Sequence, residues 1–345
     1  MCSSGDTLTF GRSPCKIFLD FEDFRYRFPA LPGGGSRERG CWKVTNRQKG
    51  VLMAVLGPSL WGIMGIFVRD ITSTGISVVG VSFFRCAVSG LLLLAFFAVQ
   101  KRSVLQIGWK GRIICALYGI VSYSLGFVAY SISVSRIPVA VATILMFLCP
   151  VWVTLFSTLI FRDRPDRQKI LSIVVCLVGA VLAADLLSVG NVRLDLIGML
   201  MGIFNGMSAA MQIVIPRYFA GQYSRDSMLV YGFLGAAVAL LFFTSPLEII
   251  TAFREYDALR LAGSIFAVSA LCTMVANVAF TKSAEYIDGT ESSILSALEV
   301  VVGSLAGYLV YHEHLTALQI LGMVLVVAGS LGTQIHWGKF LRRKV

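Results

Sequence analysis

Apolar residues in this chain are gathered into long runs that short polar segments separate. Each run is close to the roughly 20 residues that an α-helix needs to cross a bilayer. Some of the separating turns are very short, as at Arg136–Pro138, so we expect consecutive helices to lie antiparallel and side by side. The runs predict ten membrane-spanning helices, at residues 50–69, 76–99, 112–134, 138–161, 168–187, 195–215, 226–245, 258–281, 289–311 and 316–337.

The apolar pattern occurs twice. The stretch that begins at Ile137 is matched without a gap for over forty residues by the stretch that begins at Ile287, at an offset of 150 residues. A repeat at a fixed offset inside an apolar chain is typical of a duplicated transporter fold. Identical or similar residues stand at the paired positions Ile137 and Ile287, Ile144 and Ile294, Leu148 and Leu298, Asp163 and Glu313, Ile170 and Ile320, and Gly179 and Gly329.

Each copy would hold five helices, an odd number, so the second copy must enter the membrane from the opposite side. The predicted fold is therefore an all-α integral membrane protein whose ten transmembrane helices form two inverted five-helix repeats. The substrate site of such a fold lies between the halves near the bilayer centre, and the halves exchange conformations to give alternating access.

Composition supports lipid as the surrounding solvent. Hydrophobic residues make up 56% of the chain and charged residues 14%, against about 25% charged in a soluble domain. The net charge of +11 does not indicate nucleic acid, because the basic residues lie in short loops. With a cytoplasmic N-terminus, twenty Lys and Arg residues fall on the inner side, which predicts a multi-pass protein of the cell (inner) membrane with both termini cytoplasmic. Five fall on the outer side: Arg69, Arg136, Arg193, Arg254 and Arg260.

The chain divides into two tails and two repeats. Residues 1–48 are polar, contain the breaker run Pro29–Gly35, and lack the basic start and apolar core of a signal peptide. We expect them to form a disordered cytoplasmic tail, with a start codon assigned too early as the alternative. The predicted repeats are residues 49–187 and 195–337, followed by a basic cytoplasmic tail at 338–345.

A set of residues across positions 50–337 resembles the drug/metabolite transporter superfamily, of the EamA type. The set consists of Trp61, Arg85, the stretch Ser135–Pro138, Glu299, Glu313, Gly322 and Gly329. Three positions depart from the family pattern: Val300 follows Glu299 where the family often has proline, Pro150 follows Cys149 in the first copy, and Asp163 replaces the usual glutamate. The resemblance implies export of amino acids or related compounds, with helices 1, 3, 4, 6, 8 and 9 around a central cavity.

Two ionisable residues, Arg85 and Glu299, are predicted to lie deep in the membrane. A charge at the helix centre costs about 2.5–3.5 kcal/mol or more, so both are candidates for function. Their predicted depths differ by about one helical turn, which an arginine side chain can span. They either pair, or Arg85 attracts a substrate carboxylate while Glu299 takes a proton or an amine. A purely structural ion pair, or an arginine reaching towards water, is the alternative.

Further polar and aromatic residues within the predicted spans are candidates for substrate binding, with helix packing as the alternative for each. Trp61 is predicted near mid-membrane rather than at the interface, where Trp usually lies. Tyr123 and Tyr130 are seven residues apart and share a helix face. Asn205 and Asn277 carry amides that need polar partners in lipid, as does Gln212.

Other chemistry is not indicated. The eight cysteines form no CxxC pair or His-Cys cluster. His312, Glu313 and His314 are adjacent in one turn, where side chains rarely converge on one point, and no further ligand is evident. No metal and no cofactor is therefore predicted. Asp163 and Glu313 are expected to cap the helices that follow them. No nucleotide-binding or hydrolase motif occurs, which argues against an enzyme.

These patterns predict a secondary transporter of small metabolites that works by alternating access around a central cavity. The expected partners are a small-molecule substrate, the lipid bilayer and, as an open alternative, protons. A lipid or sugar-nucleotide transporter of the same superfamily is the second interpretation, and a membrane-embedded enzyme the third. The substrate, the transport direction, the coupling ion and the oligomeric state stay open.

Overall fold

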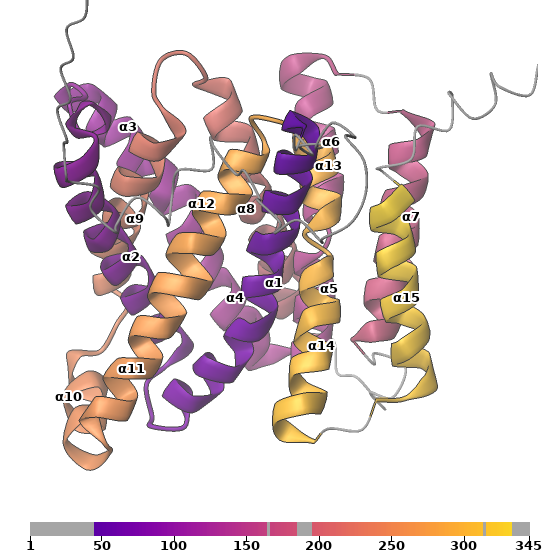
Figure 1. Ribbon diagram of the computed structural model, residues 1–345. Coiled ribbons are helices and arrows are strands. Elements are labelled where there is room, and N and C mark those ends of the chain that lie inside the picture. The colour runs from indigo at the N-terminus through magenta and orange to yellow at the C-terminus, as the bar shows by residue number, and fades with distance from the viewer. Residues whose placement is uncertain (1–44, 164–165, 185–194, 313–314, 333–345) are drawn as a thin grey trace, which may run out of the picture.

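The computed structural model describes residues 45–163, 166–184, 195–312 and 315–332, and in these ranges the chain is helical and contains no strand (Figure 1). Residues 1–44 and 333–345, which hold most of the predicted N-terminal tail and all of the C-terminal one, lie outside this part, as do Glu313 and His314.

The first half of the chain forms a series of helices, some of which are interrupted within a predicted span. Within its third and fourth predicted spans the helix changes character, at a π-helical turn and at a break around Phe147. The elements are α1 (Asn46–Thr72), α2 (Val78–Gln100), the 3₁₀ turn η3 (Arg102–Val104), α3 (Trp109–Gly119), the π-helical η4 (Ile120–Ser124), α4 (Leu125–Arg136), α5 (Val139–Met146), α6 (Cys149–Phe161) and α7 (Arg167–Ala183).

The second half repeats this order closely. Its elements are α8 (Leu196–Tyr218), α9 (Arg225–Leu241), α10 (Pro246–Glu255), α11 (Ala258–Ser269), the π-helical η6 (Ala270–Val275), α12 (Ala276–Ser283), α13 (Gly289–Leu295), α14 (Leu298–Tyr311) and α15 (Ala317–Gly332). Helices α1 and α8 begin 150 residues apart, as do η4 and η6, and α7 and α15. The only non-glycine residues with positive φ in the described chain, Arg162 (59°) and His312 (54°), have the same offset.

Seven helical stretches of the described chain are long and apolar enough to cross a membrane, or eight if α9 and α10, bent by 92°, form one span. The predicted span at 226–245 is therefore shorter than expected, because α9 ends at Leu241 and Pro246 starts a new helix. Helices α7 and α15 have 17 and 16 residues. The seven stretches are Asn46–Thr72, Val78–Gln100, Trp109–Arg136, Val141–Phe161, Leu196–Tyr218, Ala258–Ser283 and Gly289–Tyr311.

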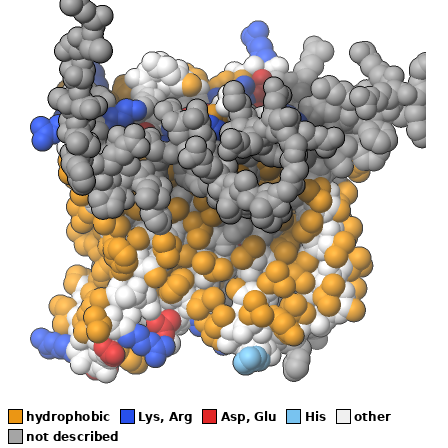
Figure 2. Space-filling view, in the orientation of Figure 1, with side chains coloured by type: hydrophobic (Ala, Val, Ile, Leu, Met, Phe, Trp, Pro, Cys, Tyr) orange, Lys and Arg blue, Asp and Glu red, His pale blue; other side chains and the backbone are white. Residues whose placement is uncertain are grey.

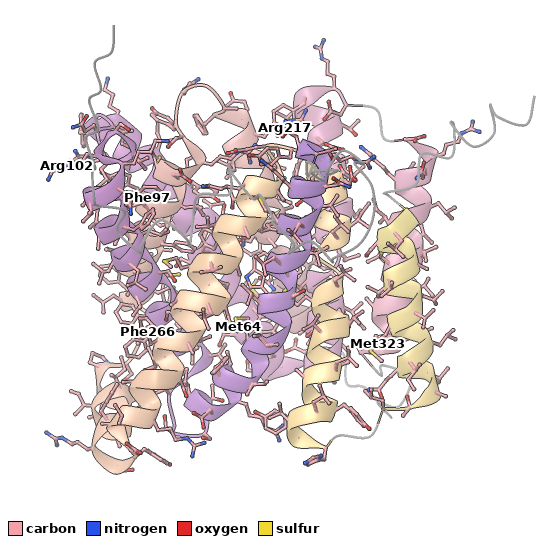
Figure 3. The ribbon with its side chains drawn as sticks, viewed as in Figure 1. Met64, Phe97, Arg102, Arg217, Phe266 and Met323 are labelled. Carbon is pink, nitrogen blue, oxygen red and sulfur yellow. The ribbon has the colours of Figure 1, made fainter. Side chains whose placement is uncertain are left out.

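The visible surface has the zones expected of a membrane protein. Hydrophobic side chains cover the middle of the bundle, and charged side chains gather at its two ends (Figure 2). Arg102 and Arg217 both lie at the upper end, whereas Phe266 points outward from the apolar zone (Figure 3). The protein is therefore a multi-pass membrane protein whose hydrophobic middle matches a bilayer.

Helices α7 and α15 pack along each other at one edge of the bundle (Figure 1). Glycines allow their backbones to meet. A Cβ atom on Gly322 would lie 2.3 Å from the Ala183 nitrogen, and one on Gly179 would lie 2.7 Å from the Val326 nitrogen. The Cys176 thiol points at the Val326 carbonyl oxygen, 3.6 Å away. Gly329, the repeat counterpart of Gly179, also lies in this contact, since a Cβ there would be 2.6 Å from Cys176 Sγ. The small-residue contact thus contains both members of the glycine pair that the repeat shares.

Candidate functional site

Arg85 lies on α2 and is held in the interior by the second half of the chain. Its side chain is buried, and its Nε donates a hydrogen bond to Thr273 Oγ1 at 2.9 Å. The guanidinium carbon lies 4.6 Å from the centre of the Phe127 ring, a cation–π contact. The guanidinium is thus oriented by one hydroxyl and one aromatic ring. Neither contact neutralises its charge.

The partner hydroxyl is positioned by an irregular helix. Thr273 belongs to the π-helical segment η6, and its Oγ1 donates to the carbonyl of Val268, five residues earlier, at 2.9 Å. The Thr273 carbonyl accepts a hydrogen bond from Asn277 Nδ2 at 2.8 Å. Single π-helical turns are frequent at functional sites. Here the turn links the predicted residues Arg85 and Asn277 through a threonine that the sequence analysis did not select.

Glu299 lies in the first turn of α14, directly after the break between α13 and α14. A carboxylate there interacts favourably with the positive end of the helix dipole. The residue is half-buried, and it is close enough to interact electrostatically with Arg85, Tyr130 and Cys149. Cys149 occupies the equivalent position, 150 residues earlier, at the start of α6. The two helix breaks therefore bring the deep acid and its repeat counterpart together.

Arg85 and Glu299 do not form the direct ion pair that the sequence analysis considered. Among the ion pairs of the described residues, none within 4 Å contains either group, and the Arg85 Nε is bonded to Thr273 instead. The two charges still interact over a longer distance. A guanidinium and a carboxyl group that do not pair with each other can each bind one end of a small charged substrate.

Trp61 and Tyr130 lie near this centre. The Trp61 ring is 5.0 Å from that of Phe280, at an angle of 57°. The Tyr130 side chain lies close to Thr143 on α5 and interacts electrostatically with Glu299. Gly62 brings α1 against α14, since a Cβ there would lie 2.8 Å from the Glu299 carbonyl oxygen. Trp61 and Glu299 are therefore carried on two helices in close contact.

Tyr123 lies apart from these residues. It is 1% exposed and packs in the hydrophobic core, with its ring 4.7 Å from Phe233 on α9. Its hydroxyl is 3.4 Å from that of Tyr118. Although Tyr123 and Tyr130 are predicted to share a face, they are two turns, or roughly 10 Å, apart along the helix. They consequently have different neighbours.

The predicted amides also separate. Asn277 joins the Arg85 network, as described above. Asn205 is buried on α8 beside α4, where a Cβ on Gly126 would lie 3.4 Å from its Oδ1. Gln212 Nε2 donates to the Ser122 carbonyl at 3.1 Å and so supports the π-helical turn η4. A hydrogen bond between helices is the observed role of Gln212.

A second polar feature, at the upper end of the bundle, was missed by the sequence analysis. It is a cavity of about 310 Å³, which we call the upper pocket. Four hydroxyls and four charged groups line it: Thr154, Ser157, Thr158 and Thr290, and Asp163, Lys169, Arg217 and Asp288. These residues lie on α6, α7, α8 and α13 or in the turns next to them, so only the fold brings them together.

Asp163 does not act as the helix cap that the sequence analysis expected. Its Oδ2 accepts from Arg217 Nη1 at 2.5 Å, and the residue in the N-cap position of α7 is Asp166. The prediction was wrong because the nearby arginine comes from α8, which is remote in sequence. The equivalent expectation for Glu313 falls outside the described residues. Within the described chain, no group of three His, Cys, Asp or Glu residues could hold a metal ion.

The sequence profile of the EamA-like transporter family matches this chain twice, at residues 48–184 and at residues 196–334. The chain belongs to the EamA-like transporter family. Each match covers one copy of the repeated helix order, which is how a family built on a duplicated domain is expected to match. The resemblance seen in the sequence is thereby confirmed.

Named relatives of this EamA-like protein are transporters. The pseudopaline exporter CntI of Pseudomonas aeruginosa (strain UCBPP-PA14) is 23% identical, covering 82% of this chain and 95% of the exporter. The threonine/homoserine exporter RhtA of Salmonella typhimurium (strain SL1344) is 24% identical, covering 74% and 81%. The S-adenosylmethionine uptake transporter of Rickettsia bellii (strain RML369-C) is 22% identical, covering 77% and 86%.

A solved crystal structure of another protein has the same fold. It superposes with a TM-score of 0.68 at 15% identity, and the match covers 83% of this chain and 96% of the other. At that identity the likeness concerns the arrangement of helices alone.

Proposed function

We propose that this protein is a secondary transporter that exports amino acids or related small zwitterions by alternating access. The observation that carries the proposal is the central pair of charges: Arg85, oriented by Thr273, and Glu299, which lies at a helix break without neutralising it. An arginine that is oriented but unpaired suits a carboxylate, to which it can donate two parallel hydrogen bonds. The acid suits an ammonium group or a proton.

The proposed topology is ten membrane spans in two inverted repeats. Helices α1 and α8 hold equivalent positions in the two copies but run in opposite directions. Arg47 at the start of α1 pairs with Glu291 on α13, and Arg217 at the end of α8 lines the upper pocket with Asp288, the N-cap residue of α13. The start of α1 and the end of α8 therefore share one end of the bundle, which supports the inversion.

The irregular helices support a site between the halves. Two π-helical turns and two helix breaks recur at the repeat offset, and three of these four irregularities lie beside Arg85 or Glu299. Transporter sites are typically formed where helices are discontinuous, because unpaired helix ends can bind charged groups there. In the proposed mechanism these points are also where the halves bend between the two open states.

The names of the relatives favour amino-acid-like cargo. One is named for threonine and homoserine, and another for S-adenosylmethionine, which carries an amino-acid group. Two of the three are named exporters and one an uptake transporter, so export is the favoured direction. The competing proposal of a sugar-nucleotide or lipid transporter calls for a basic cavity, whereas the upper pocket holds equal numbers of acids and bases.

Counterflow tests the proposal directly. Purified full-length protein is reconstituted into liposomes loaded with unlabelled L-threonine, and uptake of external radiolabelled L-threonine is followed. We expect transient accumulation above protein-free liposomes, with L-homoserine, L-serine and S-adenosylmethionine compared under the same conditions. Counterflow of UDP-glucose but of none of these amino acids would replace our proposal with the sugar-nucleotide alternative.

A further inference from the structure

The upper pocket joins the two halves of the chain through two ion pairs. Asp163 and Lys169 come from the first half, and Arg217 and Asp288 from the second. Arg217 pairs with Asp163, and Lys169 pairs with Asp288. Arg217 is also held against the Phe161 ring, with the guanidinium carbon 4.2 Å from the ring centre. The pocket thus contains two cations and two anions and has no net charge of its own.

All four charged side chains keep contact with solvent. The side chains of Arg217 and Asp163 are 36% and 42% exposed, and those of Lys169 and Asp288 are 32% and 35% exposed. Ion pairs this exposed contribute little to stability, with a typical value of about 0–1 kcal/mol. A ligand can therefore exchange with either pair at small energetic cost.

The fold does not require this set of polar residues. At the repeat offset, Arg217 corresponds to Phe67, Asp288 to Pro138 and Lys169 to Gln319. Asp288 and Pro138 are the N-cap residues of α13 and α5, so the positions correspond in structure as well as in sequence. Three of the four charges therefore occur in one copy only, which points to a use at one end of the bundle.

An apolar layer separates the upper pocket from the central charges. Val153, Ile213 and Phe280 are buried together, and Trp61 packs against them. This layer adjoins the pocket, because a Cβ on Gly289, between the pocket residues Asp288 and Thr290, would lie 2.6 Å from Ile213 Cγ2. On the other side Trp61 is followed by Gly62, which contacts Glu299. A thin apolar barrier thus lies between two polar sites.

We propose that the upper pocket is a separate binding site for a small zwitterion, occupied before the substrate reaches Arg85 and Glu299. The carboxylate of the zwitterion replaces Asp163 on Arg217, and its ammonium group replaces Lys169 on Asp288. Both displaced side chains turn to solvent. The inference rests on the proposed function in one respect, namely that the cargo is a zwitterion.

Charge balance selects the ligand class. A bound zwitterion pairs with both Arg217 and Asp288, the two groups whose partners it displaces, so the charges inside the pocket stay balanced. A ligand with a single charge exchanges one pair and leaves the other pair closed across the pocket. The volume of about 310 Å³ suits one small molecule, since ligand sites begin near roughly 300 Å³. Exchange against existing ion pairs makes binding weak and sensitive to salt.

Thiol protection tests this site without relying on transport. Thr158, an exposed residue of the pocket, is replaced in the full-length protein (Thr158→Cys), and the protein is placed in lipid nanodiscs. A charged thiosulfonate modifies the new thiol, and its rate is followed by mass spectrometry of the peptide carrying residue 158. The probes are L-threonine, the cation L-threoninol and the anion 2,3-dihydroxybutanoate, each titrated at constant ionic strength.

We expect L-threonine to slow the modification by about fivefold at roughly four times its Kd, and both single-charge analogues to protect much less at the same concentration. Adding Arg217→Gln should abolish the protection, and Arg217→Lys should weaken it. Arg136→Gln should leave it intact. Arg136 is the matched control, because it pairs with Asp195 at 2.9 Å and joins the first half to the opposite end of α8.

Equal protection by all three probes, by none of them, or protection that survives Arg217→Gln would overturn the inference. Counterflow separates this outcome from failure of the proposed function. Transport of L-threonine without protection rejects the upper pocket and retains the transporter. Protection without transport retains the pocket and rejects L-threonine as cargo.

Discussion

Arg85 on α2 donates a hydrogen bond of 2.9 Å to the hydroxyl of Thr273, a residue 188 positions later in a π-helical turn. This bond joins the two halves of the chain at the level of the central charges. It also orients the guanidinium without cancelling its charge. The consequences of this arrangement can be measured in two ways.

Thr273→Val should reduce stability and transport together. The substitution keeps the shape of the side chain but removes the acceptor of a buried donor, and leaving such a group unsatisfied costs about 1–3 kcal/mol. We expect a lower Tm for the purified protein and slower L-threonine counterflow. Thr273→Ser keeps the hydroxyl and is the control. If the valine variant matched wild type in both measurements, Thr273 would have no positioning role.

Arg85→Lys should raise the KM for an amino acid substantially while changing the Tm little. Lysine keeps the positive charge but cannot donate two parallel hydrogen bonds to a carboxylate. Loss of one charge-assisted bond is worth about 1.5–3 kcal/mol, which corresponds to a rise of about ten- to hundredfold in KM. Initial rates over a range of L-threonine concentrations measure it. An unchanged KM would place the carboxylate elsewhere.

Gly322→Ala should destabilise the protein through the contact between α7 and α15. The new methyl group would lie 2.3 Å from a backbone nitrogen and 2.6 Å from the Gly179 carbonyl oxygen, and backbone atoms cannot rotate away. Overpacking of this kind costs about 1–3 kcal/mol. Gly263→Ala on α11 is the control, because a Cβ there meets nothing within 4 Å. Thermal unfolding should show a lower Tm only for the first variant.

The ion pair between Arg136 and Asp195 lies at the end of the bundle opposite the upper pocket. Removing it should lower the stability of the protein by an amount that depends on pH. The hydrogen bond from Arg136, together with one from the backbone of Ile197, lowers the pKa of Asp195. A lowered folded-state pKa means that the pair stabilises the protein above the unfolded pKa, near 3.9, and that this contribution is lost as the pH falls through the folded value. Arg136→Gln should therefore lower the Tm at pH 7, and the difference from wild type should shrink below about pH 4. A Tm difference that is constant down to pH 3 would contradict this.

The repeat in the sequence anticipated the spacing of the structural elements. Equivalent helices begin 150 residues apart because the same apolar and polar order recurs, and even the left-handed residues Arg162 and His312 follow this spacing. The burial of Arg85 could also be predicted, since this residue stands inside a long apolar run. Such properties depend on residues that are close together in the sequence, so the hydrophobic pattern is enough to predict them.

The contacts of these residues could not be predicted in the same way. Nothing near Arg85 in sequence indicates Thr273, and periodicity does not reveal a π-helical turn or the break before Glu299. The pairing of Asp163 with Arg217 and the upper pocket depend on helices that only the fold brings together. One pattern in the sequence does point to Thr273. It stands 150 residues after Tyr123, which is itself a candidate for substrate binding.

The most direct test of the central claim is the effect of a pH gradient on transport by wild type and Glu299→Gln. Liposomes containing the purified protein are given an acidic interior, and uptake of radiolabelled L-threonine is compared with uptake without a gradient. If Glu299 exchanges a proton for the substrate, the gradient should stimulate uptake by wild type, and Glu299→Gln should lose that stimulation while retaining counterflow. Equal stimulation of the two proteins would contradict the role of Glu299, and no uptake by either would contradict transport of this amino acid.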